Sequence, residues 1–324
     1  MCTAISYKTN CHYFGRNLDL EYSYNETVTV TPRNFPFHFK RVSDMNTHYG
    51  IIGMAYINNG YPLYYDAANE KGLAMAGLNF PENARYNFEL AHKDNITPFE
   101  LIPWILGQCQ STDEAKRLLM RTNIVNLHFS DELQNTPLHW LICDKASCIV
   151  VEPVHDGLKI YDNPVGVLTN NPPFDMMLMN LNNYISLSNK EAKNSFSDKL
   201  KLSPYSRGMG ALGLPGDLSS QSRFVRAAFT KLNSDSGNSE EESICQFFHI
   251  LNSVYQQRGC NLVGDKYEIT VYSSCINTDT GIYYYTTYEN SQISAVDMQK
   301  ENLNTDKLIS YPLIKSQNIN FQNK

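Results

Sequence analysis

The chain has 324 residues, 42% of them hydrophobic and 19% charged, a composition typical of a globular protein with a large core. Its net charge of −6, without a cluster of Lys and Arg interleaved with aromatic residues, excludes nucleic acid as the expected partner. No stretch approaches the roughly 18 apolar residues of a membrane span, so we also expect no membrane partner.

The first half of the chain predicts strands followed by two helices. Residues 4–7 and 13–19 alternate around a short turn, as in a β-hairpin. Further strands are expected at 27–31, 49–56 and 73–80. Two capping-box patterns then predict helix starts: Thr97-Pro98-Phe99-Glu100 and Ser111-Thr112-Asp113-Glu114.

The second half begins with a hairpin whose arms are residues 137–143 and 148–152. Further strands are expected at 157–161, 165–170, 267–275, 282–288 and 292–297. Helices are expected at 175–187, 219–232 and 239–257, the last opened by the capping box Ser239-Glu240-Glu241-Glu242. Residues 188–213 are the most loop-like stretch, and a polar tail begins at about residue 312.

Strands therefore come in hairpin runs at both ends of the chain, with helices in blocks between them. This order predicts an α+β fold with antiparallel sheets rather than alternating βαβ units. No linker, repeat or low-complexity segment divides the sequence, so we expect one domain over residues 1–324.

Cys2 directly follows the initiator Met1. If Met1 is removed, Cys2 carries a thiol nucleophile and a free α-amine on one Cα. An α-amino group has a pKa of roughly 7.7–8.0, so near neutral pH it can accept a proton from the thiol. Such a residue combines a nucleophile with its own base.

Arg16 and Asp19 lie at the end of the strand that is expected to pair with the segment containing Cys2. An arginine and a carboxylate beside a terminal amine and a thiol would orient the amine and favour the thiolate. Taken alone, the two residues are better explained as a surface ion pair.

Asn79 and Asn170 each end an apolar strand, where an amide donor could stabilise an oxyanion, although Asn is also a common strand terminator. Arg223 stands on a predicted helix after a turn-rich segment. Its alternative interpretation is an ordinary solvated arginine, which is what we expect of Arg226 one turn later.

The eight cysteines and eight histidines are dispersed, without CxxC, HExxH or a Cys/His ligand spacing. We therefore expect reduced thiols and no metal site. The N-terminal segment has neither the basic nor the apolar region of a signal peptide, so we expect a cytoplasmic protein.

Five segments in fixed order resemble the choloylglycine hydrolase family, in particular its bile salt hydrolases, from Cys2 to about Tyr311. They are Met1-Cys2-Thr3, Phe14-Gly15-Arg16-Asn17-Leu18-Asp19, the stretch from Asn69 to Pro81, Leu168-Thr169-Asn170-Asn171-Pro172, and the stretch from Gly213 to Phe224. The combination is highly specific, whereas no single segment is.

The resemblance implies a four-layer αββα N-terminal-nucleophile hydrolase, a homotetramer that needs no cofactor. It implies that Cys2 is the nucleophile and its amine the base, and that Arg16 and Asp19 position them. It further implies that Asn79 and Asn170 stabilise the oxyanion, and that Arg223 tunes the electrostatics of the site.

The implied reaction is hydrolysis of glycine- and taurine-conjugated bile salts through a thioester. A steroid needs an apolar pocket, and by their position in matching segments Leu18, Phe129 and Leu133 are candidates to line it, although such residues more often form core.

Three alternatives stay open. The first is a penicillin V acylase, or another N-acyl amide hydrolase of the family; the penicillin branch usually carries Tyr where this chain has Asn79. The second is a thiol peptidase that uses His139 or His249 as base. The third is a protein that binds bile acids without hydrolysing them.

Overall fold

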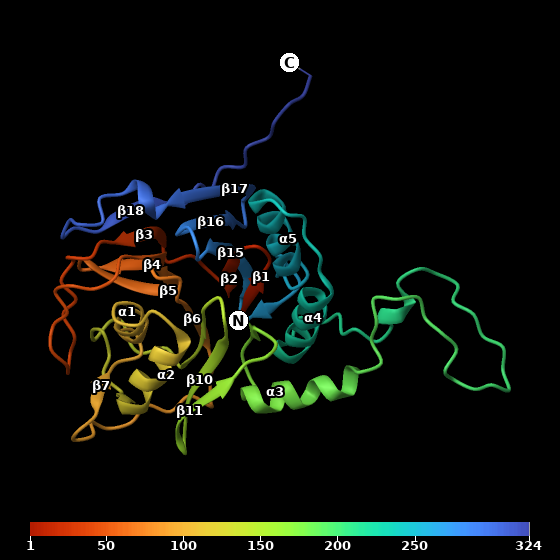
Figure 1. The fold of residues 1–324 in the computed structure, drawn as a ribbon, viewed down its shortest axis with the longest axis horizontal. Helices are drawn as coiled ribbons and strands as arrows, with labels where there is room; N and C mark the ends of the chain where they lie inside the picture. Colours follow the sequence, from red (N-terminus) through yellow and green to blue (C-terminus); the bar gives the residue numbers. More distant parts are fainter. Residues whose placement is uncertain (324) are drawn as a thin grey trace.

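Two antiparallel sheets dominate the computed structural model, which describes residues 1–323 (Figure 1). The six-stranded sheet has the order β12 (Val167–Leu168), β1 (Cys2–Lys8), β2 (His12–Leu20), β15 (Ile269–Asn277), β16 (Ile282–Thr287) and β17 (Asn290–Asp297). The eight-stranded sheet has the order β11 (Gly157–Asp162), β10 (Cys148–Val154), β9 (Leu138–Cys143), β6 (Ala74–Asn79), β5 (Tyr61–Asn69), β4 (Ile51–Asn58), β3 (Thr27–Thr31) and β18 (Ile309–Pro312).

Helices cover the outer faces of both sheets. Helices α4 (Ser220–Asn233) and α5 (Glu240–Asn252) contact the six-stranded sheet, and α1 (Leu101–Leu106) contacts β5 and β6 of the other sheet. Helix α2 (Thr112–Arg121) packs beside α1, and α3 (Phe174–Asn180) follows β12. The predicted α+β fold, with two stacked antiparallel sheets between helical layers, is confirmed.

Smaller elements complete the chain. Strands β7 (Asp94–Ile96) and β8 (Thr122–Ile124) pair in parallel, and β13 (Leu262–Val263) pairs with β14 (Lys266–Tyr267). Short 3₁₀ turns occur at Leu181–Tyr184, Met209–Ala211 and Met298–Lys300. Among the described residues, no helix combines the length and apolar character needed to cross a membrane.

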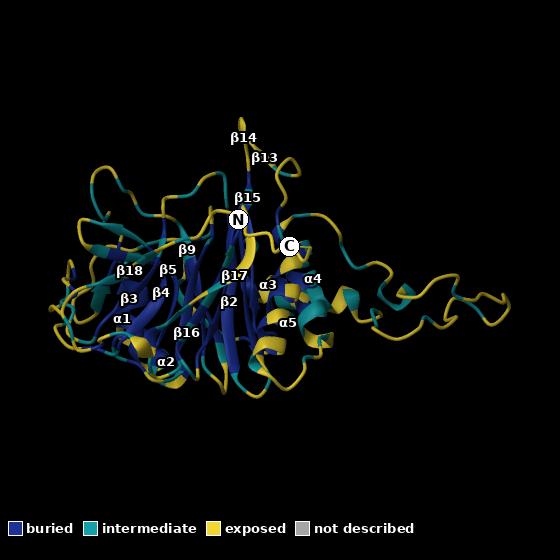
Figure 2. Ribbon diagram, turned by 90° about the horizontal axis from the view of Figure 1, so that it is seen from above, coloured by how far each residue is buried: buried dark blue, intermediate teal, exposed yellow. Residues whose placement is uncertain are grey.

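The core has two parts, which follow from the alternation of apolar residues along the strands (Figure 2). One lies between the sheets and beneath α4 and α5, and includes Phe14, Ile52 and Phe247. The other lies between the eight-stranded sheet and α1 and α2, and includes Trp140 and Ile105. This sandwich is the rigid frame that holds the start of β1.

Helix boundaries depart from the sequence expectations at specific caps. The capping box of Ser239 is complete. Helix α5 nevertheless ends at Asn252 rather than 257, and Val254 and Gln256 lie outside it, because the Gln256 N–H donates to Thr270 Oγ1 at 2.9 Å instead of to a helical carbonyl. At the first predicted box, Glu100 accepts from Thr97 N–H at 3.0 Å, yet the helix begins only at Leu101.

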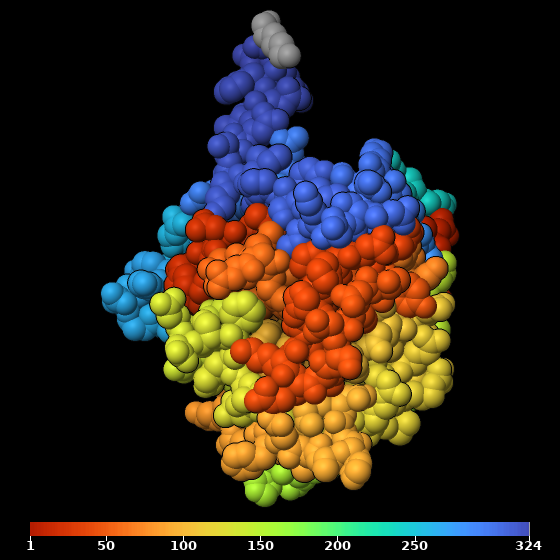
Figure 3. All heavy atoms as spheres, turned by 90° about the vertical axis from the view of Figure 1, so that its left-hand side faces the viewer, coloured from red at the N-terminus to blue at the C-terminus, as the bar shows by residue number. Residues whose placement is uncertain are grey.

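Two segments project from the body. Residues 188–213, predicted as a loop, form a long arm beyond α3 that contains only the 3₁₀ turn (Figure 1). The polar tail follows β18, an edge strand that the sequence analysis missed, and rises from the body as the blue segment in Figure 3.

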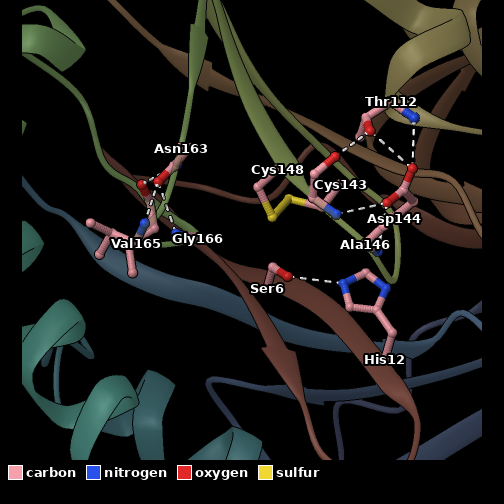
Figure 4. The surroundings of a disulfide bond; sticks show 12 residues. Ser6, His12, Thr112, Cys143, Asp144, Ala146, Cys148, Asn163, Val165 and Gly166 are labelled. Carbon is pink, nitrogen blue, oxygen red and sulfur yellow. Dashed lines mark hydrogen bonds between the residues drawn. A yellow bond between two sulfur atoms is a disulfide. The ribbon is translucent and has the colours of Figure 1, made fainter.

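The expectation that every cysteine is a reduced thiol is wrong for one pair. Cys143 and Cys148 lie directly opposite each other in the β9–β10 register, with Cα atoms 4.2 Å apart, and form a disulfide (Figure 4). This distance lies just below the usual range of about 4.4–6.8 Å for disulfides. The six other cysteines are free thiols.

Candidate active site

The β1–β2 hairpin brings Cys2, Arg16 and Asp19 together. In its register Cys2 lies opposite Leu18, and Ala4 lies opposite Arg16. Directly opposed side chains share one face of a sheet, so Cys2, Arg16 and Leu18 face the eight-stranded sheet, whereas Asp19 points to the side of α4 and α5. The hairpin therefore places Arg16 on the face that carries the Cys2 thiol, which we call the thiol side. It places Asp19 on the opposite face, towards α4 and α5, which we call the amine side.

Asn170 holds the backbone nitrogen of Cys2. Cys2 N donates to Asn170 Oδ1 at 2.9 Å, and Arg223 Nη2 donates to the same oxygen at 2.7 Å. Both donors lack a lone pair, so the atom that they contact must be the amide oxygen. The Asn170 Nδ2 consequently points to the Asn79 carbonyl, 2.7 Å away.

Arg223 is fully buried and links α4 to the start of the chain. It donates to Cys2 O at 2.5 Å, to Thr3 Oγ1 at 2.7 Å and to Leu218 O at 3.0 Å. Burial lowers the pKa of Arg223, and the charge of Asp19 opposes that shift. Arg226, expected to be solvated, is instead half-buried and donates to three backbone carbonyls.

Arg16 supplies a buried positive charge on the thiol side. Its Nη1 donates to the carbonyls of Tyr65 at 3.0 Å and Gly77 at 2.5 Å, and its Nη2 has no hydrogen-bond partner among residues 1–323. Burial acts to lower the pKa of Arg16, but charge on the Cys2 thiol, Tyr272 and Asp66 raises it above the ordinary value. The guanidinium therefore stays charged beside Cys2.

Asp19 is the acidic group on the amine side. Its Oδ1 accepts from Thr270 Oγ1 at 2.6 Å, while its buried Oδ2 lacks a hydrogen-bond partner within the described part of the chain. Burial raises the pKa of Asp19, and the Arg223 guanidinium and the N-terminal ammonium counteract this rise. The free oxygen is suited to accept from a cationic amine.

Met1 is present in this structure and occupies the space next to the site. Its ammonium donates to Glu268 Oε1 and to the Asp19 carbonyl, at 2.6 Å each, and Asp19 N–H donates to the Met1 carbonyl at 2.9 Å. With this residue attached, the Cys2 nitrogen is a peptide nitrogen and cannot act as a base.

A mostly apolar cavity of about 230 Å³ opens beside the thiol. Cys2, Arg16 and Asn79 line it, together with all three candidate pocket residues, Leu18, Phe129 and Leu133. Asn79 ends β6, and its Oδ1 is buried without a hydrogen-bond partner in the described structure. The cavity can thus take an apolar acyl group with its carbonyl near the thiol.

Neither histidine of the peptidase alternative lies at this cavity. His139 is buried, and its ring nitrogens bond to Glu152 Oε1 at 3.0 Å and Thr169 O at 2.8 Å. His249 is exposed on α5. Both are therefore placed for structural or surface roles.

Sequence reasoning missed several residues of the site. Thr270 and Glu268 come from the start of β15 and the segment before it, a region that the sequence analysis treated only as a strand. Tyr24, Tyr56 and Phe99 add aromatic surface to the cavity. The chain contains 21 tyrosines, which is a signal of amphipathic binding surface, but the count does not identify which of them meet at the cavity.

Comparisons with known proteins agree on one group. A family model described as linear amide C–N hydrolases, choloylglycine hydrolase family, matches residues 2–311. The chain is 60% identical to a bile salt hydrolase/transferase of Lactiplantibacillus plantarum, with 97% of each chain covered. It is 40% identical over the full length of both chains to a bile salt hydrolase/transferase of Clostridium perfringens.

Solved structures show the same pattern. The C2A variant of the C. perfringens conjugated bile acid hydrolase superposes with a TM-score of 0.92, at 40% identity and with both chains fully covered. A penicillin V acylase from Agrobacterium tumefaciens has a TM-score of 0.74 at 21% identity, with 95% of this chain and 90% of that chain covered, and shares the fold.

Proposed function

The chain belongs to the choloylglycine hydrolase family of linear amide C–N hydrolases, and we propose that it hydrolyses the amide bond of glycine- and taurine-conjugated bile salts. The observation that carries the proposal is Cys2, buried at the start of β1 beside Arg16 and opening onto an apolar cavity. Relatives at 60% and 40% identity that are named for bile salts support the substrate class.

The reaction starts when Met1 is removed, which frees the Cys2 amine. The amine takes the thiol proton, and the thiolate attacks the carbonyl that joins the steroid acid to the amino acid. The Arg16 guanidinium favours the thiolate, and Asp19 Oδ2 holds the ammonium that forms. We assign stabilisation of the oxyanion to the amides of Asn79 and Asn170.

The same groups carry out the breakdown of the tetrahedral intermediate. The ammonium of Cys2 returns its proton to the departing nitrogen, so that glycine or taurine leaves and a thioester remains on the sulfur. The amine then takes a proton from water, which attacks the thioester and releases the bile acid. Arg223 keeps Asn170 and the Cys2 backbone aligned throughout, through bonds of 2.5–2.7 Å.

One assay tests the function. Purified protein is incubated with glycine- and taurine-conjugated bile salts and, separately, with penicillin V, while release of amino acid and of phenoxyacetate is measured. We expect release of glycine and taurine by the wild type and none by Cys2→Ala. Preferential release of phenoxyacetate would instead favour the penicillin acylase alternative.

We also propose that the protein is a homotetramer. The 188–213 arm supports this proposal, because it projects from the body (Figure 2). It also carries strongly exposed apolar side chains, including Phe196 (81%) and Tyr205 (87%). Light scattering should report four chains per particle, and Phe196→Asp together with Tyr205→Asp should lower that number. Light scattering that reports a monomer for the wild type would contradict the proposal.

Three expectations remain predictions. Limited proteolysis should cut the arm and the tail before it divides the remaining single domain. Activity should survive dialysis against a chelator, because every step above uses only groups of the chain. Cell fractionation should recover the protein in the cytoplasm.

A further inference from the structure

A buried carboxylate binds the ammonium of Met1. Glu268 is 3% exposed; its Oε1 lies 2.6 Å from the Met1 nitrogen, and its Oε2 lies 3.3 Å from Asn261 Nδ2. The Asp19 carbonyl accepts from the same ammonium at 2.6 Å. Glu268 and the Asp19 carbonyl therefore form a polar site in which a primary ammonium is already bound.

This site lies within reach of the Cys2 nitrogen. The Met1 and Cys2 nitrogens are joined through N–Cα, Cα–C and C–N bonds, so they are at most about 4 Å apart. Because Glu268 Oε1 lies 2.6 Å from the Met1 nitrogen, it is at most about 6–7 Å from the Cys2 nitrogen, a gap that a change of the Glu268 rotamer or a bridging water closes.

Removal of Met1 leaves Glu268 without its cation. Loss of the partner of a carboxylate in a largely desolvated site is costly, which favours a new positive group beside it. The neighbouring Arg223 already uses four of its five N–H donors on Cys2, Thr3, Leu218 and Asn170. Excision itself creates the replacement, because it turns the Cys2 nitrogen into an ammonium.

We propose that Glu268 is a positioning residue for the catalytic amine, binding the ammonium of Met1 before excision and the ammonium of Cys2 afterwards. The inference rests on the proposed N-terminal-nucleophile function and adds a second carboxylate to Asp19. Asp19 holds the amine from β2, and Glu268 holds it from the segment that precedes β15.

The other charged or titratable groups around this amine are the Cys2 thiol on β1, Asp19 and Arg16 on β2 and Arg223 on α4, while Tyr255, after α5, interacts with the charge of Asp19. A carboxylate beside an ammonium favours the protonated form. Replacing Glu268 by Gln keeps the shape but removes the charge, so the amine should lose its proton at lower pH. The acidic limb of the kcat/KM profile should shift downward by about one pH unit.

Glu240→Gln is the matched control. Glu240 also bonds to the six-stranded sheet, accepting from Asn277 at 2.7 Å and from Tyr284 at 2.9 Å, but at the opposite end of β15. Intact mass shows whether each variant has lost Met1, and protein that retains Met1 is treated with methionine aminopeptidase before assay. The control should keep the wild-type pH profile.

A second measurement does not depend on any substrate. In a Cys2→Ala background, the pH dependence of N-terminal acetylation by acetic anhydride reports protonation of the α-amine, with and without Glu268→Gln. A downward shift in both measurements for Glu268→Gln alone supports the proposal. An unmoved labelling curve, or an equal shift of the acidic limb in Glu240→Gln, overturns it. Failure of the wild type to cleave bile salts would overturn the proposed function, and the labelling would still decide the role of Glu268.

Discussion

Replacing Arg223 by Met tests whether this arginine positions Cys2 for catalysis in addition to stabilising the fold. Methionine fills much of the same volume but cannot donate, so Cys2 O, Thr3 Oγ1, Leu218 O and Asn170 Oδ1 each lose a hydrogen bond. A buried polar group without a partner costs about 1–3 kcal/mol, and relaxation of the site lowers the sum to an expected loss of about 3–5 kcal/mol.

This loss converts into a measurable shift. At about 2.1 cal/mol/K per residue, 324 residues give an unfolding entropy of about 0.7 kcal/mol/K, so Tm should fall by about 4–7 °C. The effect on catalysis should be larger, because Asn170 and the Cys2 backbone lose their common anchor. A displacement of about 1 Å typically costs about a hundredfold in rate, and we expect kcat to fall by that amount.

Arg226→Met is the control on the same helix. Arg226 donates to the carbonyls of Ser253, Pro215 and Asp217 and to no atom of Cys2 or Asn170. It should lower Tm while changing kcat by less than about threefold, measured on conjugated bile salts well below both melting temperatures. A kcat of Arg223→Met within threefold of wild type, or an equal loss in Arg226→Met, would refute the reasoning.

Active protein should have lost Met1 by intact mass; Cys2→Ala should be inactive and Cys2→Ser nearly so, since a hydroxyl is far less acidic than a thiol. Full activity with Met1 attached would contradict the role of the amine. Asn79→Ala should lower kcat about a hundredfold for glycine and taurine conjugates alike, because an oxyanion donor does not touch the leaving group; a raised KM with unchanged kcat would indicate ground-state binding instead. Burial lowers the pKa of His12 to about 4, so the unfolded chain binds this proton first as pH falls. The free energy of unfolding should drop by about 3 kcal/mol from this group between pH 6.5 and 4, and His12→Gln should flatten that part of a urea-unfolding pH series; an unchanged slope would exclude His12 as the cause.

Sequence reasoning located the parts of the site that depend on local pairing. Arg16 and Asp19 could be placed beside Cys2 because a short hairpin fixes their register. Glu268 and Thr270 could not be placed there, since their approach depends on the pairing of β2 with β15, about 250 residues away along the chain. Such long-range pairing is not encoded in the alternation of either strand alone.

The disulfide shows a different limit. Cys143 and Cys148 flank the four-residue turn of a hairpin that was predicted correctly, so counting the register would have put them opposite each other. The expectation of reduced thiols rests on the dispersion of the cysteines along the chain, which does not take the register of this hairpin into account. The edge strand β18 was missed because Ile309–Pro312 is short and acquires its strand character from β3.

The burial of Cys2 within a sheet makes the two chain ends unequal for protein engineering. Cys2 is 3% exposed and pairs on one side with β2, while Ala4 and Ile5 of the same strand also pair with β12. An affinity tag, fluorescent protein or surface linker fused there would, like Met1, keep the Cys2 nitrogen in a peptide bond and so block the amine. At the other end, residues 315–323 are exposed and extend away from the body (Figure 3). Immobilised or displayed forms of this hydrolase should therefore be attached through the C-terminal segment.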